Sequence, residues 1–277
     1  MASVVYLHGM GGARPHWADP LQLPEGIACV APQYADLIDH GSDVYARPPS
    51  IVAEESTASE RAAYVDRQRE LVRELEARGE AIPRGTAWPS FLPHPARLPD
   101  RLPLPRVLRS SIFGVDQVGR YLDDEGRRAA ILLRVRAALD AAEPPVVVIA
   151  HSLGSVVMVD LLADLPRDIA LLVTVGSPLG HEAVGRSISG SPFPYGRVGG
   201  WVNVVHLLDP VPFGRGLADR FPAAHDLYLP VTAGLGPGSI LTGIARAATA
   251  HLDTTYLASD TVRAAVRYGL GSMAESS

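Results

Sequence analysis

One short stretch of the sequence places a serine among the neighbours that a nucleophilic serine needs. The residues Ala150-His151-Ser152-Leu153-Gly154 directly follow the strand-like run PVVVI. Small residues stand two positions before and two positions after Ser152, where the backbone of a sharp strand-to-helix turn is crowded. Such a turn presents the serine hydroxyl at the carboxyl edge of a sheet, where ligands of open α/β sheets bind. The stretch therefore predicts a nucleophile at Ser152; the alternative is a serine that only caps the next helix.

The acid of such a site is expected later in the chain. A serine attacks well only when a base removes its proton and a carboxylate orients that base. In the chain order serine, acid, histidine, the acid stands just past a later strand. Asp209 follows the run VVHLL and precedes a proline, so we predict that it is the acid; an aspartate that only opens a turn is the alternative. Glu182 and Asp226 are the next candidates, but neither follows a strand end as directly.

Two histidines beyond Asp209 are candidates for the base. His225 stands at the entrance of the last predicted strand, which is the wrong end of it for the site. His251 follows that strand and a glycine-rich loop, just before the terminal helix, where a loop can reach the serine. We therefore predict His251 as the base. His151 is the neighbour of the nucleophile, but its side chain should point away from the hydroxyl, so no proton transfer is assigned to it.

Acyl transfer also needs hydrogen-bond donors for the oxyanion. The first predicted donor is the backbone N–H of Leu153, the residue after the nucleophile. The second is expected from the loop HGMGG after the first strand, with Met10 as the donor. This loop lacks the G-x-G-x-x-G spacing and the helix start of a phosphate-binding loop.

Short apolar runs that alternate with helical patterns must position these residues. The predicted strands are Val4–His8, Ile27–Ala31, Val146–Ala150, Leu171–Val175, Val202–Leu208 and Leu227–Val231. Their residues are apolar without alternation, which is typical of strands covered on both faces. Helical patterns are predicted over Glu125–Ala142, Ser152–Leu165 and Ser259–Tyr268. The alternation predicts an α/β fold, with a mainly parallel central sheet flanked by helices, in a single domain over 1–277.

The segment 41–111 breaks this alternation. It holds a charged helix predicted over Ser56–Arg78, followed by the proline-rich run IPRGTAWPSFLPHPARLPDRLPLP. Proline at this density continues neither a central strand nor a helix interior. The segment is either a solvent-facing excursion or a cap, and we expect it to cover the mouth of the site without adding strands to the sheet. The apolar residues that could line an acyl channel, or only pack the segment on the body, are Trp88, Phe91, Leu92 and Phe113.

Composition excludes several classes of function. The formal net charge is −5 and no basic block occurs, which argues against a nucleic-acid partner. Cys29 is the only cysteine, so an intramolecular disulfide is impossible. The chain has no lysine, which excludes a Walker-type lysine, a Schiff-base lysine and a Ser–Lys dyad. Without a signal-peptide layout or an apolar span long enough for a bilayer, we expect a cytoplasmic protein with no transmembrane segment, and we predict no metal and no cofactor.

Several motifs together resemble one superfamily. The stretches YLHGMGG, VVVIAHSLGSVV, TVGSPLG, WVNVVHLLDPVPF and AHLDTTYL look like the α/β-hydrolase superfamily, specifically its bacterial esterase- and lipase-like members. The resemblance covers nearly the whole chain apart from the segment 41–111. It implies an α/β-hydrolase fold, with 41–111 as an insertion or cap region. It also implies the triad Ser152–Asp209–His251, which the spacing argument reaches separately.

The resemblance also includes residues that accompany the acid and the base along the chain. In such proteins a strand-borne W-x-N precedes an Asp-Pro, and a histidine followed by a tyrosine opens the last helix; here these are Trp201, Asn203 and Tyr256. Two departures matter for function. Ala150 replaces the usual first glycine of the serine motif, and the proline-rich segment 41–111 has no clear match in the superfamily.

Three functions are compatible with these residues. The first is a serine hydrolase that cleaves an ester or thioester of a small-molecule or lipid acyl substrate through an acyl-enzyme on Ser152. The second is an acyltransferase with the same triad, in which an alcohol or amine replaces water. The third is a non-catalytic binding protein of the same fold, which a missing triad member would favour; all three members are present.

Overall fold

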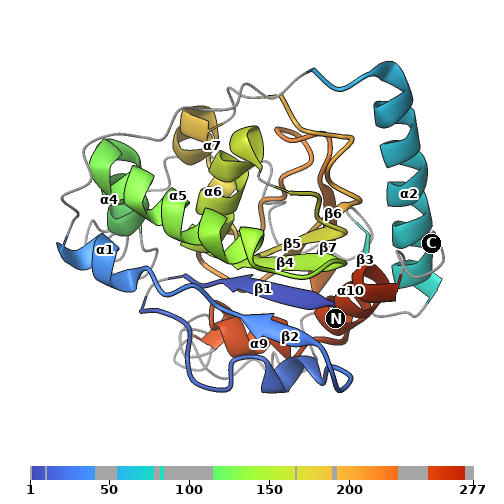
Figure 1. Ribbon diagram of the computed structural model, residues 1–277, viewed down its shortest axis with the longest axis horizontal. Helices are drawn as coiled ribbons and strands as arrows, with labels where there is room; N and C mark the ends of the chain where they lie inside the picture. Colours follow the sequence, from blue (N-terminus) through green and yellow to red (C-terminus); the bar gives the residue numbers. More distant parts are fainter. Residues whose placement is uncertain are drawn as a thin grey trace, which may run out of the picture.

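The computed structural model centres on one β-sheet (Figure 1). The structure describes residues 2–9, 11–40, 55–77, 82–83, 115–165, 167–188, 192–229 and 249–271. Within them the sheet has seven strands in the order β2-β1-β4-β5-β6-β7-β3. The strands span Ser3–Leu7 (β1), Ala28–Val30 (β2), Ile82–Pro83 (β3), Val146–His151 (β4), Leu171–Val175 (β5), Trp201–His206 (β6) and His225–Leu229 (β7). All neighbouring strands are parallel except β3 and β7.

Helices cover both faces of the sheet, because the strands carry apolar side chains on both sides. In β4, Val148 and Ala150 join one buried cluster, whereas Val147 and Ile149 join the cluster on the opposite face. The first face packs against α1 (Ala35–His40), α4 (Val115–Asp123), α5 (Glu125–Asp140), α6 (Leu153–Leu161) and α7 (Glu182–Ile188). The second packs against α9 (Asp253–Leu257) and α10 (Asp260–Gly271). Short 3-10 helices span Asp19–Leu21, Leu162–Asp164 and Pro178–Gly180.

The parallel sheet between two layers of helices confirms the α/β fold class that the sequence predicts. Every predicted strand overlaps a strand of the sheet, and Leu171–Val175 coincides with β5. The predicted last strand begins earlier in the structure, at His225, and its residues 230 and 231 lie outside the described residues. Among the described helices, none combines the length and the apolar content that crossing a membrane requires.

The segment 41–111 adds a short strand to the sheet, so the prediction that it contributes none is wrong. Strand β3 pairs antiparallel with β7, with Ile82 opposite Tyr228 and Pro83 opposite Leu227. It forms the edge of the sheet. Proline lacks an N–H, but on an edge strand the missing N–H can be the one that faces outward, so the ladder tolerates proline there. The proline content of the segment therefore excludes a central strand without excluding an edge strand.

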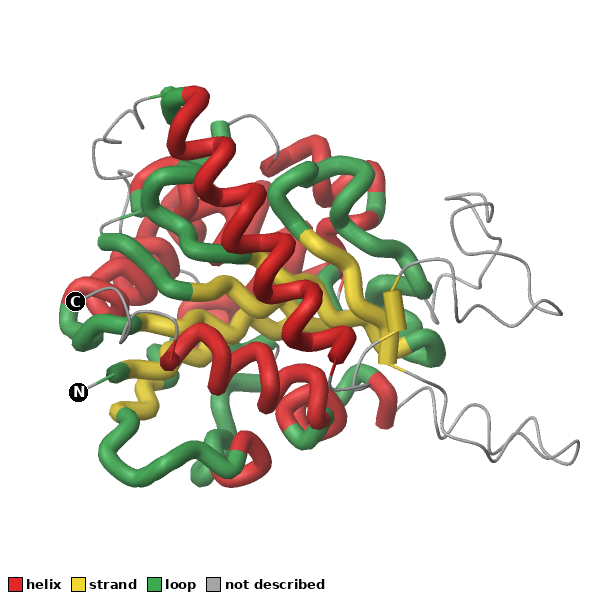
Figure 2. The backbone as a smooth tube through the Cα atoms, turned by 90° about the vertical axis from the view of Figure 1, so that its right-hand side faces the viewer, coloured by secondary structure: helices red, strands yellow, loops and turns green. Residues whose placement is uncertain are grey.

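The long helix of the same segment, α2 (Ala58–Ala77), lies against the amino ends of the strands. The side-chain amide of Gln68 donates to the carbonyl of Trp201 at 2.7 Å and accepts from the N–H of Trp201 at 2.9 Å. The Tyr64 hydroxyl donates to the carbonyl of Ala223, just before β7 begins. Trp201 opens β6, so these contacts lie at the amino edge; in Figure 2, viewed from this side, α2 lies in front of the strands. For this helix, the prediction that the segment covers the mouth of the site is wrong.

Sequence periodicity identifies a helix but not the surface on which the helix docks. The buried positions of α2 are Tyr64, Leu71 and Leu75. Of these, Leu71 and Leu75 pack in the apolar cluster on the second face of the sheet, together with residues of α10. The rest of the proline-rich run, after β3, lies outside the described residues, as do Trp88, Phe91, Leu92 and Phe113. That these four side chains line an acyl channel stays a prediction.

Candidate active site

Ser152 lies in a sharp turn between β4 and α6, in a conformation that L residues rarely adopt. Its backbone angles are φ 52° and ψ −121°. Strained backbone persists only where neighbouring groups hold it. Here the Ser152 N–H donates to the Val175 carbonyl of β5 at 3.0 Å. The Ser155 hydroxyl donates to the Ser152 carbonyl at 2.6 Å and lies 2.7 Å from the Ser177 hydroxyl. The Ser152 side chain makes no capping hydrogen bond to α6, so capping does not explain the serine.

The small residues around Ser152 are required by close approaches of backbone. A methyl group on Gly154 would collide with the carbonyl oxygen of Leu7 in β1. A methyl group on Gly9, in the loop after β1, would lie 3.0 Å from the Ser152 Cβ and 3.0 Å from His151 Nδ1. The first turn of α6 and the loop after β1 therefore have no room for a larger side chain at position 154 or at position 9.

The crowding at Gly154 predicts the outcome of a substitution. Gly154→Ala is expected to lower the free energy of unfolding by about 1–3 kcal/mol, because the new methyl group overpacks against rigid backbone. Gly119→Ala on α4 is the control, since its nearest neighbour is an Asp123 oxygen at 3.9 Å. There alanine fits, and it should raise the free energy of unfolding by up to about 1 kcal/mol. Urea unfolding measures both; equal stability of the two variants would contradict the expected crowding.

The structure brings together the three residues that the sequence predicts as nucleophile, base and acid. His251 Nε2 lies 3.0 Å from Ser152 Oγ. His251 Nδ1 lies 3.0 Å from Oδ1 and 2.9 Å from Oδ2 of Asp209. A carboxylate only accepts hydrogen bonds, so Nδ1 carries the proton and Nε2 is free to accept from the serine hydroxyl. Ser152 is 5% exposed and Asp209 is 1% exposed, so bulk water hardly competes for these contacts.

Asp209 has more donors than the histidine alone. Its Oδ1 accepts from the N–H of Val211 at 2.8 Å, and its Oδ2 accepts from the Tyr256 hydroxyl at 2.6 Å. The Val211 contact is the turn before proline that the alternative interpretation of Asp209 proposed. Asp209 therefore both opens this turn and contacts His251. Strand β6 ends at His206, so a short turn separates the strand from the acid instead of the direct succession that the sequence suggests.

Gly176, directly after β5, leaves the space in which the acid and the base meet. Its φ is +57°, a conformation that favours glycine. A Cβ at this position would lie 3.0 Å from Asp209 Oδ2, 3.1 Å from a ring carbon of Tyr256 and 3.2 Å from His251 Nδ1. The motif TVGSPLG carries this glycine, but its role was not predicted. A glycine that ends the strand beside the serine strand is the signal that could have found it.

The other candidates for acid and base lie elsewhere. Asp226 is buried in β7, where it accepts from the Asn203 side-chain amide at 2.8 Å and from the Leu217 N–H at 2.7 Å. Glu182 pairs with Arg186 on α7. His225 opens β7 opposite Val202, which is the amino end of the strand. None of the three contacts Ser152 or His251.

His151 contacts the backbone of the base rather than the nucleophile. Its Nε2–H donates to the carbonyl of His251 at 2.9 Å, and the two rings lie 4.8 Å apart. Burial, and secondarily the neighbouring His251, lowers the pKa of His151 to about 3. His151 is therefore neutral near neutral pH, and it anchors the His251 loop without adding positive charge beside the base.

One predicted oxyanion donor can be placed and the other cannot. Leu153 is the first residue of α6, so its N–H belongs to the helix N-terminal donors that have no partner within the helix. Met10 lies outside the described residues. Its neighbour Gly9 is described and packs against Ser152, which brings the loop after β1 to the serine.

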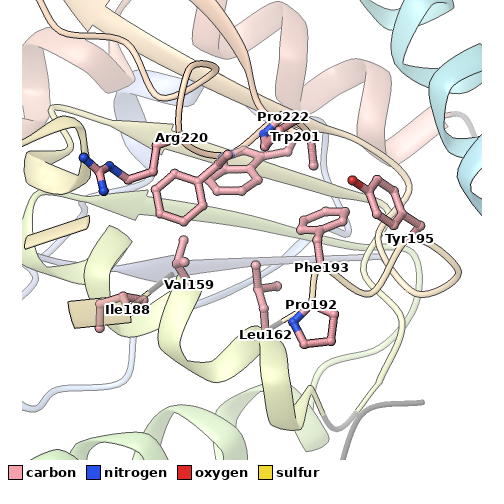
Figure 3. A pocket seen from close by; sticks show the side chains of 11 residues that line it. Val159, Leu162, Ile188, Pro192, Phe193, Tyr195, Trp201, Arg220 and Pro222 are labelled. Carbon is pink, nitrogen blue, oxygen red and sulfur yellow. The ribbon is translucent and has the colours of Figure 1, made fainter. Parts of the chain in front are cut away.

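A cavity of about 230 Å³ lies between α6, α7 and the loops that flank β6 (Figure 3). Aromatic side chains line it, and the rings of Phe193 and Phe221 lie 5.8 and 5.6 Å from the ring of Trp201. Val159 is its lining residue nearest to Ser152 in the chain, and two helical turns correspond to about 10 Å along α6. Its lining includes none of Ser152, Asp209 and His251. Within the described ranges, no group of three or more His, Cys, Asp or Glu side chains is placed to hold a metal ion.

The comparisons with known proteins leave the site to be interpreted from its own geometry. No protein-family model, no curated protein and no solved structure matches this chain. The order and direction of the strands establish the α/β architecture without them. Any closer kinship, including the resemblance to α/β-hydrolases, rests on the motifs and on the contacts of the site.

Proposed function

We propose that this protein is a serine hydrolase of the α/β-hydrolase superfamily that cleaves an ester or thioester through an acyl-enzyme on Ser152. The observation that carries the proposal is the continuous hydrogen-bonded path from the serine to a buried carboxylate. Ser152 Oγ lies 3.0 Å from His251 Nε2, and His251 Nδ1 lies within 3.0 Å of both oxygens of Asp209. A nucleophile, a base and a group that orients the base are what acyl transfer through a serine requires.

The proposed reaction has two halves. Ser152 Oγ attacks the acyl carbon while its proton passes to His251 Nε2, and the carbonyl electron pair moves to the oxygen. As the tetrahedral intermediate collapses, the bond to the leaving group breaks and His251 returns the proton to the leaving oxygen or sulfur. A water molecule then attacks the acyl-enzyme in the same way, releasing the acid and restoring Ser152. In both halves the positive charge on the imidazolium is stabilised by Asp209.

The start of α6 supports stabilisation of the oxyanion. Leu153 directly follows the nucleophile, and its N–H is available at a helix N-terminus, where partial positive charge favours an anion. The second donor is proposed to come from Met10, because the loop that carries it packs against Ser152 through Gly9. The strained backbone at Ser152 is also consistent with a functional turn, since such strain gathers at reactive sites.

A covalent probe tests the function directly. A fluorophosphonate reagent is expected to form one adduct on the folded protein, at Ser152, because only an activated serine attacks such a reagent readily. Peptide mapping by mass spectrometry locates the adduct, and heat-unfolded protein is the control that should not react. p-Nitrophenyl esters of rising acyl length then define the substrate class. Labelling at another serine, or turnover of the esters without labelling, would rule out the proposed mechanism.

A further inference from the structure

Tyr256 on α9 contacts the same carboxylate as the proposed base. Its hydroxyl donates to Asp209 Oδ2 at 2.6 Å and accepts from the N–H of His206 at 3.1 Å. The side chain is fully buried. His206 is the last residue of β6, and Tyr256 stands five residues after His251 in the chain. One phenol thus joins the end of a strand, the acid and the helix that follows the base.

The contacts of Asp209 fix the orientation of its carboxylate. Val211 donates to Oδ1 and Tyr256 donates to Oδ2, so each oxygen has one donor besides the histidine. The carboxylate cannot rotate without breaking one of these bonds. His251 Nδ1 then lies almost equally far from the two oxygens, at 3.0 and 2.9 Å, and its ring is aimed at Ser152.

We propose that Tyr256 is a positioning residue of the proposed hydrolase. Its hydroxyl fixes the orientation of the Asp209 carboxylate, and it also reduces the stabilisation that Asp209 gives to the protonated form of His251. This inference rests on the proposed function. A donor on Oδ2 draws negative charge away from the carboxylate, so the imidazolium is stabilised less. Burial, and secondarily the nearby Asp209, raises the pKa of Tyr256 well above its ordinary value, so the phenol stays protonated and always donates.

Other titratable groups face the Asp209–His251 pair. His151 and His206 are adjacent, and burial lowers the pKa of both, which favours their neutral forms. Arg14, which pairs with Asp253 at 3.6 Å, and His8 are close enough to act electrostatically on His151. These groups are the same in the wild type and in the variants below, so a difference between the proteins reports on the bond that was removed.

The experiment compares two fully buried tyrosines whose hydroxyls donate to different carboxylates. Tyr256→Phe removes the hydroxyl that bonds Asp209. Tyr121→Phe is the matched control, since Tyr121 is also fully buried and its hydroxyl donates to Asp160 Oδ2 at 2.6 Å. Asp160 stands two helical turns past Ser152 on α6. Both variants lose a buried hydrogen bond to a carboxylate, and Tyr256→Phe also leaves the His206 N–H without this acceptor, so both stabilities should fall and that of Tyr256→Phe should fall more.

Only Tyr256→Phe is expected to change the kinetic parameters that depend on Asp209 and His251. With a p-nitrophenyl ester, kcat should fall about tenfold while KM changes by less than about twofold, because orientation matters most in the transition state. The acid limb of the pH–rate profile should move to higher pH, since the imidazolium gains stabilisation when Asp209 keeps its full charge. Tyr121→Phe should leave kcat and the acid limb unchanged. A fall in kcat without movement of the limb, or equal effects of both variants, would overturn the inference.

A spectroscopic readout separates this inference from the proposed function. NMR titration of His251, and the downfield resonance of its Nδ1–H, need no turnover. In Tyr256→Phe the titration should move to higher pH and the resonance should shift; an unchanged titration in a folded variant refutes the role of Tyr256, whether or not the protein is a hydrolase. Absence of fluorophosphonate labelling in the wild type refutes the function alone. If Tyr256→Phe does not fold, fluorotyrosine in place of Tyr256 keeps and strengthens the donor, and must move the titration to lower pH.

Discussion

Replacing Ser152 by alanine is expected to lower kcat for ester hydrolysis by about 10⁴- to 10⁶-fold, as removal of the nucleophile does in other triads. The physical reason is that the other two residues cannot form an acyl-enzyme without the serine oxygen. His251 Nε2 then loses the hydroxyl that lies 3.0 Å away. Alanine keeps the same backbone strain at φ 52°, so the free energy of unfolding should change little. Steady-state rates and urea unfolding on the same samples measure both quantities.

An exposed serine supplies the control for this prediction. Ser187 lies on α7 in the sequence GRSIS, which has small residues around a serine but follows no strand. Ser187→Ala should hydrolyse the ester at the wild-type rate and should still be labelled at Ser152. Loss of turnover in Ser187→Ala, with Ser152→Ala remaining active, would place the chemistry at a different serine.

The second large effect concerns the base. His251→Ala should lower kcat by about 10⁴-fold or more, because no other described side chain contacts Ser152 Oγ through a basic nitrogen. Wild-type activity should also fall as the pH is lowered, since a protonated His251 cannot accept the serine proton. Initial rates across pH, for both proteins and with one ester, test the two statements.

His225→Ala is the second variant of this experiment, and it distinguishes between the two candidate bases. His225 is the other histidine that follows Asp209, and the structure places it at the amino end of β7, opposite Val202. Its replacement should leave kcat within about twofold of the wild type, since it reaches no group of the triad. If His225→Ala abolishes turnover in a folded protein while His251→Ala retains it, the assignment of the base is wrong.

Much of the arrangement could be predicted because local patterns carry it. A strand buried on both faces has continuous apolar residues, and the small residues around Ser152 follow from the crowding of one turn. The chain order of serine, aspartate and histidine then restricts the partners to a few positions. These signals lie within short stretches, so they can be read without knowing which elements meet.

The contacts that were missed depend on elements far apart in the chain. Gly176 clears space between Asp209 and His251, which come from two other loops; the sequence shows a glycine at the end of a strand but not the residues for which it makes room. The bond from Tyr256 to Asp209 joins residues 47 apart. Strand β3 has only two residues, too few for any periodicity, and it exists because β7 offers a free edge. Each of these is a property of the assembled fold.

The docking of α2 bears on whether the segment 41–111 is a removable module. Gln68 completes the hydrogen bonding of Trp201, and Leu71 and Leu75 are buried in the cluster shared with α10. A chain shortened by this segment would present that apolar surface to water and would leave β7 with an open edge. Helix α2 and strand β3 are therefore part of the cooperative unit that folds, and rearrangements of the gene that remove them would disturb the body that carries the proposed triad.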